Sequence, residues 1–127
     1  MTITIRCDGR EWREESPDAV DDRLNQLHDA AERPTSASLE LSGGQVVDLA
    51  VGSDRSFVQF MPNAPDPPYL IPVGDRPDER AVFVFFADGH WTEVLQRNTL
   101  PIEAARKLVR ELVGSHQAPD SVGWEEA

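Results

Sequence analysis

Cysteine and long apolar runs are nearly absent from this sequence. Cys7 is the single cysteine, so an internal disulfide is impossible, and a lone thiol suits a reducing compartment. No apolar run approaches the ~20 residues that span a bilayer, so no transmembrane helix is expected. The opening segment, residues 1–6, alternates like a strand and lacks the features of a signal peptide. These absences predict a cytoplasmic protein.

Basic residues are also scarce. The chain has 12 Lys and Arg against 23 Asp and Glu, which gives a formal net charge of −11. Acids outnumber bases by 9 to 5 in residues 1–35, by 7 to 3 in 36–80 and by 7 to 4 in 81–127, so the excess is spread over the chain. Nucleic-acid binding needs clustered Lys and Arg and is therefore not expected. An acidic body favours basic protein partners, although solubility alone would explain the same charge.

The residue patterns of common catalytic and metal sites are missing. The chain has 3 histidines, and none has a second His or Cys at metal-ligand spacing. It has no serine nucleophile elbow, phosphate-binding glycine loop or Walker-type lysine. Cys7 has no flanking pattern that would lower its pKa, so we expect a small, partly buried hydrophobe there. We therefore predict no enzymatic activity, no cofactor and no metal.

Two amphipathic helices are predicted, over about 17–33 and about 101–113. Ser16 is a good N-cap for the first helix, Pro17 suits its first position, and Pro34 ends it. Gly114 is the expected C-terminal stop of the second. The apolar stripes that should face the sheet are Val20, Leu24, Leu27 and Ala31 in the first helix, and Ile102, Ala105, Val109 and Leu112 in the second.

Alternation and turn signals predict about 6–8 short strands in a mainly antiparallel sheet. The segments with this pattern are 3–7, 10–13, 37–41, 46–51, 56–61, 69–73, 81–86, 90–95 and a closing segment around Val122 and Trp124. Pro72 confines its strand to a sheet edge, and Asp88-Gly89 is the strongest hairpin turn. Residues 81–86 are apolar on both faces, which is typical of a central strand or of one whose second face a partner covers. We predict a single α+β domain over residues 1–127.

The aromatic residues fall into two groups. Phe57, Phe60, Phe83, Phe85 and Phe86 are expected in the core. Trp12, Tyr69, Trp91 and Trp124 lie near polar loops or a chain end, where they would either cover the core or anchor a protein interface. Tyr69, beside the proline-rich segment 62–68, is expected to be the most exposed. Glu93 shares a strand face with Trp91 and Leu95 and is expected to be an ordinary strand carboxylate.

The C-terminal third carries a family resemblance. A hydrophobic hairpin containing Gly89–Glu93 is followed by a proline-led helix from Leu100-Pro101-Ile102, a stop at Gly114 and the ending Pro119–Trp124. This order resembles immunity protein family one of bacterial polymorphic toxin systems. The resemblance implies an α+β antidote that binds a secreted toxin, often one with a deaminase-type domain, and occludes its active site or substrate groove. It carries over no catalytic residues.

Within this interpretation the partner is a basic cognate toxin domain, with no direct nucleic-acid or membrane binding. The chain itself would be a monomer or a weak homodimer. We predict the toxin contact on the acidic mid-chain loops, at Asp66, Tyr69, Asp75, Asp78 and Glu79, because binding residues concentrate on loops held by a rigid scaffold.

Two alternatives stay open. The chain could be a non-catalytic scaffold module that self-associates through a sheet edge, which a concentration-dependent dimer would indicate. It could also be an enzyme with an unrecognised site, which would require a strongly pKa-shifted carboxylate or histidine in a deep pocket.

Overall fold

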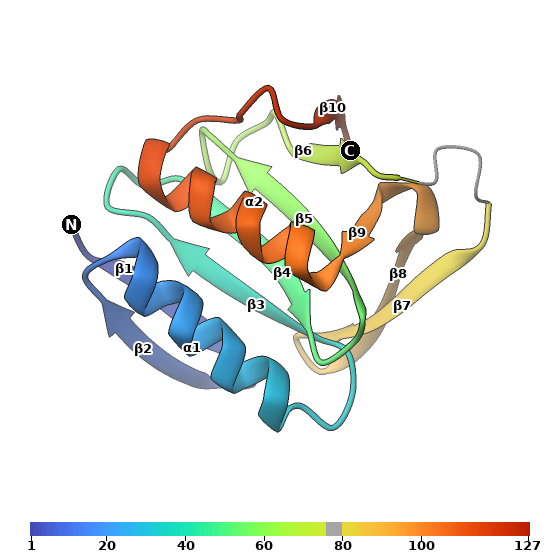
Figure 1. Ribbon diagram of the computed structural model, residues 1–127, viewed down its shortest axis with the longest axis horizontal. Helices are drawn as coiled ribbons and strands as arrows, with labels where there is room; N and C mark the ends of the chain where they lie inside the picture. The colour runs from blue at the N-terminus through green and yellow to red at the C-terminus, as the bar shows by residue number, and fades with distance from the viewer. Residues whose placement is uncertain (76–79) are drawn as a thin grey trace.

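In the computed structural model, two helices lie side by side on one face of a mainly antiparallel sheet (Figure 1). The structure describes residues 1–75 and 80–127. The predicted α+β class is confirmed. The described part has ten strands rather than the predicted 6–8, because all nine candidate segments pair and one further short strand, Thr99–Pro101, pairs with residues 55–57. Neither helix has the length and apolar character needed to cross a bilayer.

The elements follow one another along the chain with a short 3₁₀ turn before the second helix. They are β1 (Ile3–Cys7), β2 (Arg10–Glu14), α1 (Pro17–Ala30), β3 (Thr35–Glu40), β4 (Val46–Val51), β5 (Arg55–Met61), β6 (Leu70–Val73), β7 (Val82–Ala87), β8 (His90–Leu95), η1 (Gln96–Asn98), β9 (Thr99–Pro101), α2 (Ile102–Ser115) and β10 (Gly123–Glu126). The strand order across the sheet is β10-β6-β5-β4-β3-β1-β2.

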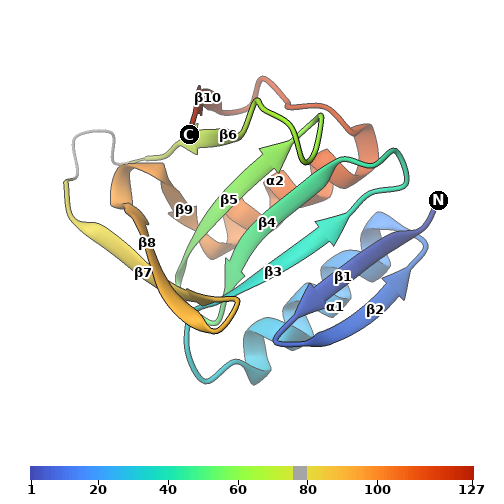
Figure 2. The same ribbon diagram turned by 180° about the vertical axis from the view of Figure 1, so that it is seen from behind.

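The main core lies between the two helices and the sheet. Alternate residues of β1, β3, β4 and β5 point toward the helices, as a strand period of two requires. Among the largest side chains there, Ile5, Leu39, Leu49 and Leu112 have no exposed surface. The predicted stripe of α2 is buried, whereas α1 buries only Val20 and Leu24. The opposite face of the sheet carries no helix (Figure 2).

Helix α1 begins as predicted and ends earlier. The Ala19 N–H donates to the Ser16 hydroxyl at 3.1 Å, and Pro17 opens the helix. Its last helical residue is Ala30, three short of the predicted end, because Ala31 is already extended. Arg33 precedes a proline, and that position disfavours helical backbone.

Helix α2 ends differently from the prediction. Gly114 lies inside the helix, and His116 adopts the left-handed cap conformation at φ 61°. The His116 N–H donates to the Leu112 carbonyl at 2.8 Å, which satisfies one of the last helical carbonyls. The expectation that Gly114 stops the helix is therefore wrong.

Strand β6 is not at the edge of the sheet, contrary to the prediction from Pro72. It lies between β5 and β10, and Pro72 is opposite Trp124 of β10. The Asn98 side-chain amide donates to the Pro72 carbonyl at 3.1 Å. The closing segment around Trp124 is thus a strand paired with the middle of the chain, and the Trp124 ring packs on the main core.

The β7–β8 hairpin lies at the margin of the sheet and crosses its helix-free side (Figure 2). Strand β7 pairs along its length with β8 but meets β3 only at the parallel bridge between Thr35 and Phe86. One face of the hairpin packs Phe83 and Phe85 on Ala50 and Phe57, which forms a second small core. The other face has no cover, so β7 is not a central strand buried on both sides.

Polar contacts, some of them to the buried Arg55 side chain, hold segments near the hairpin. The Arg55 guanidinium of β5 donates to the Thr99 carbonyl at 2.9 Å and to the Asp75 carboxylate at 2.8 Å. Arg97, just after β8, pairs with Glu125 of β10 at 2.9 Å. The segments before and after the hairpin are therefore tied to the rest of the sheet.

Two glycines give a matched stability test of this anchorage. A Cβ on Gly74 would lie 2.0 Å from the Thr99 carbonyl oxygen, whereas a Cβ on Gly114 meets open space inside a helix. Gly74→Ala should cost more than about 2 kcal/mol of unfolding free energy, because backbone atoms must shift. Gly114→Ala should add about 0.5–1 kcal/mol. Urea unfolding of both variants checks the pair; equal effects would contradict the close approach at Gly74.

Candidate functional site

The uncovered face of the β7–β8 hairpin is the most apolar exposed surface of the described chain. We call it the outer hairpin face and define it by Val82, Val84, Phe86, Trp91, Glu93 and Leu95. Four of the five large hydrophobic side chains that are strongly exposed in the described residues lie on it, and Trp91 is 57% exposed. Contiguous exposed apolar surface with a polar rim is typical of a protein-binding site.

The strand register explains why these side chains lie together. Val82 is opposite Leu95, Val84 is opposite Glu93, and Phe86 is opposite Trp91, so each pair points to the same side. The Phe86 and Trp91 rings meet edge to face, with centroids 5.6 Å apart. The Arg33 guanidinium lies 3.7 Å from the centroid of the Phe86 ring, which links the hairpin to the segment before β3.

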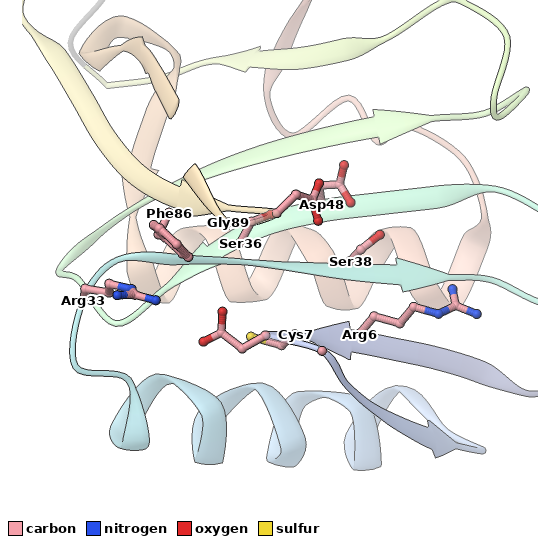
Figure 3. Close-up of a pocket in the computed structure, with 11 residues that line it drawn as sticks. Arg6, Cys7, Arg33, Ser36, Ser38, Asp48, Phe86 and Gly89 are labelled. Atoms are coloured by element: carbon pink, nitrogen blue, oxygen red, sulfur yellow. The ribbon is translucent and has the colours of Figure 1, made fainter. Parts of the chain in front are cut away.

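A concave region lies beside this face on the helix-free side of the sheet (Figure 3). Its volume is about 840 Å³. We call it the sheet hollow, and it is lined by Arg6, Cys7, Asp8, Gly9, Arg33, Ser36, Ser38, Asp48, Phe86, Asp88 and Gly89. Phe86 and Arg33 belong to its wall and also to the edge of the outer hairpin face, so the two surfaces are continuous.

Two similar turns bring acidic side chains to the hollow. Asp8-Gly9 joins β1 to β2, and Asp88-Gly89 joins β7 to β8. In both turns the aspartate and the glycine have positive φ, the geometry that a two-residue hairpin of matching twist requires. Both turns line the hollow, although they lie far apart in the sequence.

Asp48 contributes a less solvated carboxylate to the same hollow, from the middle of strand β4 (Figure 3). Burial raises the pKa of Asp48, and the nearby Asp88 charge raises it further, while a hydrogen bond from Ser38 opposes the shift. The hollow also holds two guanidinium groups, but Arg6 is paired with Glu11 and Glu40, and Arg33 lies over the Phe86 ring. Its three carboxylates, one of them weakly hydrated, therefore leave a small excess of negative charge that favours an approaching cation.

The Cys7 thiol in the hollow is weakly reactive. Burial, assisted by Asp8, raises the pKa of Cys7 to about 11, so its thiol stays protonated at neutral pH and is a poor nucleophile. Within residues 1–75 and 80–127, no group of three His, Cys, Asp or Glu side chains is arranged to hold a metal ion.

The predicted loop residues lie in separate environments. Asp66 is exposed in a turn where its N–H donates to the Asn63 carbonyl at 2.9 Å. The Tyr69 hydroxyl donates to the Pro65 carbonyl at 2.6 Å, and its side chain is partly buried. Asp75 pairs with Arg55 and so also has a structural role. Asp66 and Asp75 flank opposite ends of β6, while Asp78 and Glu79 lie outside the described residues.

Two expectations about aromatic residues are corrected. Phe86 lies on the outer hairpin face and is only partly buried, because strand alternation separates it from Phe85. Trp91, not Tyr69, has the most exposed ring among the described aromatics. The predicted shared face of Trp91, Glu93 and Leu95 is confirmed. The two-faced apolar character of β7 was the signal that could have identified this surface.

The Asp48 carboxyl gives a pH-dependent prediction. Asp48→Asn should raise the Tm at about pH 7, because burial and Asp88 disfavour the charged form. The raised pKa makes the folded state bind protons more readily than the unfolded state, so the wild type gains relative stability as the pH falls toward about 4. The advantage of the variant should therefore shrink at low pH, as thermal unfolding at several pH values would show.

The matched control is Asp8→Asn, which removes a carboxylate from an exposed turn of the same hollow. Asparagine tolerates positive φ, so the turn should persist, and this variant measures what the loss of an exposed charge alone does to the Tm at each pH. A Tm advantage of Asp48→Asn that grows at low pH would be inconsistent with a raised carboxyl pKa.

Comparison with known proteins identifies a family for this chain. The model of one protein family, described as immunity protein Imm1, matches residues 8–126. No curated protein matches the chain. The match includes both helices, the β7–β8 hairpin and most of the sheet hollow. Because it covers nearly the whole sequence, this chain belongs to the Imm1 immunity protein family.

Proposed function

We propose that this chain binds a cognate bacterial toxin directly and neutralises it by covering the toxin's active site or substrate groove. The observation that carries the proposal is membership of the Imm1 family in a chain with a large exposed apolar face beside an acidic hollow. The protein acts by binding, performs no chemistry on the toxin and works in the cytoplasm as one domain. Its place is within a polymorphic toxin system.

Charge supports a basic toxin as the partner. The chain carries a formal net charge of −11, and a toxin that grips nucleic acid needs a positive surface for its substrate. An acidic protein that covers this surface competes for the same positive charges. Opposite charge also speeds the encounter of the two proteins.

The acidic mid-chain loops are a proposed part of the contact. Asp66, Tyr69, Asp75, Asp78 and Glu79 would add negative charge to the approach of the toxin. Since Asp75 also neutralises the buried Arg55 guanidinium, its substitution would disturb the fold as well as the charge. A test of electrostatic attraction between the loops and the toxin should therefore substitute the other acidic residues of the loops.

Direct neutralisation gives the first functional prediction. Co-expression with the toxin encoded by the adjacent gene should restore growth, and the mixed proteins should form a stable 1:1 complex in size-exclusion chromatography with light scattering. A toxin from an unrelated locus is the specificity control and should not bind. Unchanged toxicity while both proteins are expressed and folded would refute the proposal.

Electrostatic steering of the toxin toward the acidic loops gives the second functional prediction. Asp66→Lys combined with Asp78→Lys and Glu79→Lys should slow association and flatten its salt dependence, while changing dissociation little. The control reverses three acids near helix α1 (Asp22, Asp29 and Glu32), all of them exposed. Stopped-flow association at several salt concentrations distinguishes the two sets. Slower association only in the α1 variant would place the approach path at that helix.

Self-association is the second candidate function. Among the described strands β8 pairs with β7 alone, so its other edge leaves backbone groups available to a further strand. A second copy could add to this edge. Sedimentation velocity that shows a concentration-dependent dimer, together with no binding of the adjacent toxin, would favour this function over neutralisation.

A further inference from the structure

We propose that the outer hairpin face is the central contact for the toxin, and that the toxin presents an apolar depression flanked by basic side chains. This inference rests on the proposed function and adds to it the surface and the chemistry of the partner. It places the strongest contacts on the hairpin, while the mid-chain loops contribute long-range attraction.

Exposure of large apolar side chains is the first support. Trp91 is 57% exposed, Val82 45%, Leu95 44% and Val84 42%. A free chain gains nothing from leaving these groups in water, because covering the exposed half of each side chain would release further hydrophobic free energy. Tryptophan is among the residues most enriched where protein interfaces concentrate their binding energy.

The hairpin is held rigid in the free protein. Phe85 stacks on Phe57 with ring centroids 5.5 Å apart, and Phe83 lies beside Phe85 at 6.1 Å. These inner-face contacts fix β7, and the Arg55 and Arg97 contacts hold the flanking segments. Trp91 is further restrained by the Phe86 ring. Binding through this face therefore orders few groups, which lowers its entropic cost.

Charge selects a basic protein over a second copy of this chain. Glu93 lies within the outer hairpin face, and Asp88 lies at its end beside Asp8 and Asp48 of the sheet hollow. Two copies packed through this face would bring these carboxylates toward one another, with a net charge of −11 on each copy. A toxin with basic side chains around an apolar depression meets the same groups with attraction.

The sheet hollow enlarges the proposed contact toward the area that stable protein interfaces bury. Stable protein interfaces bury roughly 800 Å² on each partner, which is more than a short two-stranded ribbon provides. The hollow adjoins the hairpin at Phe86, so one convex protein segment can cover both. A cationic side chain entering the hollow would lie near Asp48 and Asp88, whose mutual repulsion it would relieve.

The test compares single substitutions on two surfaces. Trp91→Ala should weaken binding of the purified adjacent toxin domain by about 30-fold or more, mostly through faster dissociation. Val84→Asp should weaken it at least as much, because it introduces a charge into the apolar centre. Trp91 is exposed, so the Tm of Trp91→Ala should change little. Val84→Asp places a carboxylate opposite Glu93, so its Tm should fall modestly, and its binding is measured well below that Tm. Surface plasmon resonance and thermal unfolding measure these effects.

Tyr69→Ala is the matched control, since it removes an aromatic ring from the proline-rich loop. It should change the dissociation rate by less than about threefold. Amide hydrogen exchange in the wild-type complex should also show protection across residues 82–95. Loss of affinity in Tyr69→Ala, with Trp91→Ala and Val84→Asp unchanged, would overturn the inference and leave the proposed function standing. No binding by the wild type would instead refute the proposed function itself.

A second set of variants tests whether the toxin surface that meets this face is basic. Asp88→Asn and Glu93→Gln together remove two carboxylates, and asparagine keeps the positive φ that the turn requires. The double variant should slow association and reduce its salt dependence. Faster association would show that the toxin surface at this face is acidic and would overturn the assignment of a basic partner.

Discussion

The two-residue period of strand β7 determines which of its side chains stabilise the fold and which stay exposed to solvent. Every position of the strand is apolar, and the pleat sends successive side chains to opposite faces. Phe83 and Phe85 enter a small core against Phe57, while Val82 and Val84 point to solvent. A strand that contributed to only one of these surfaces would need polar residues on its other face. The hairpin can therefore present apolar groups because its inner face already secures it.

The segments that flank the hairpin must also be held to the rest of the sheet. The buried Arg55 guanidinium joins β5, β9 and the segment before β7, and it is neutralised by Asp75. Asn98 and Arg97 both bond Glu125, so the closing strand is held to the end of the hairpin. Polar groups buried in this way are costly unless every strong contact is made. The contacts made by Arg55, Arg97 and Asn98 hold the segment after β8 against β5 and β10.

Much of the fold could be predicted from the sequence because its signals are local. The Ser16 cap, the Asp88-Gly89 turn and the alternation of β3 and β4 each depend on neighbouring residues. The ends of both helices were misplaced by a few residues, at Ala30 and Ser115, and the larger errors concern long-range pairing. Pro72 lies inside the sheet because β10, more than 50 residues away, pairs with its strand. Likewise, alternation identified β7 as apolar on both faces, but the side left exposed depends on which face packs on Ala50 and Phe57, which are far away in the sequence. The exposed apolar face could not be placed for that reason.

The exposed position of the outer hairpin face has a consequence for how such proteins change over generations. Side chains such as Trp91 and Leu95 touch water in the free molecule and contribute little to its folding. Substitutions there are nearly neutral for the scaffold, whereas substitutions of Phe83 or Phe85 are penalised by loss of packing. The residues of this exposed face can thus change one at a time during evolution, without passing through variants that fail to fold. Recognition can diversify while the architecture beneath it is inherited intact.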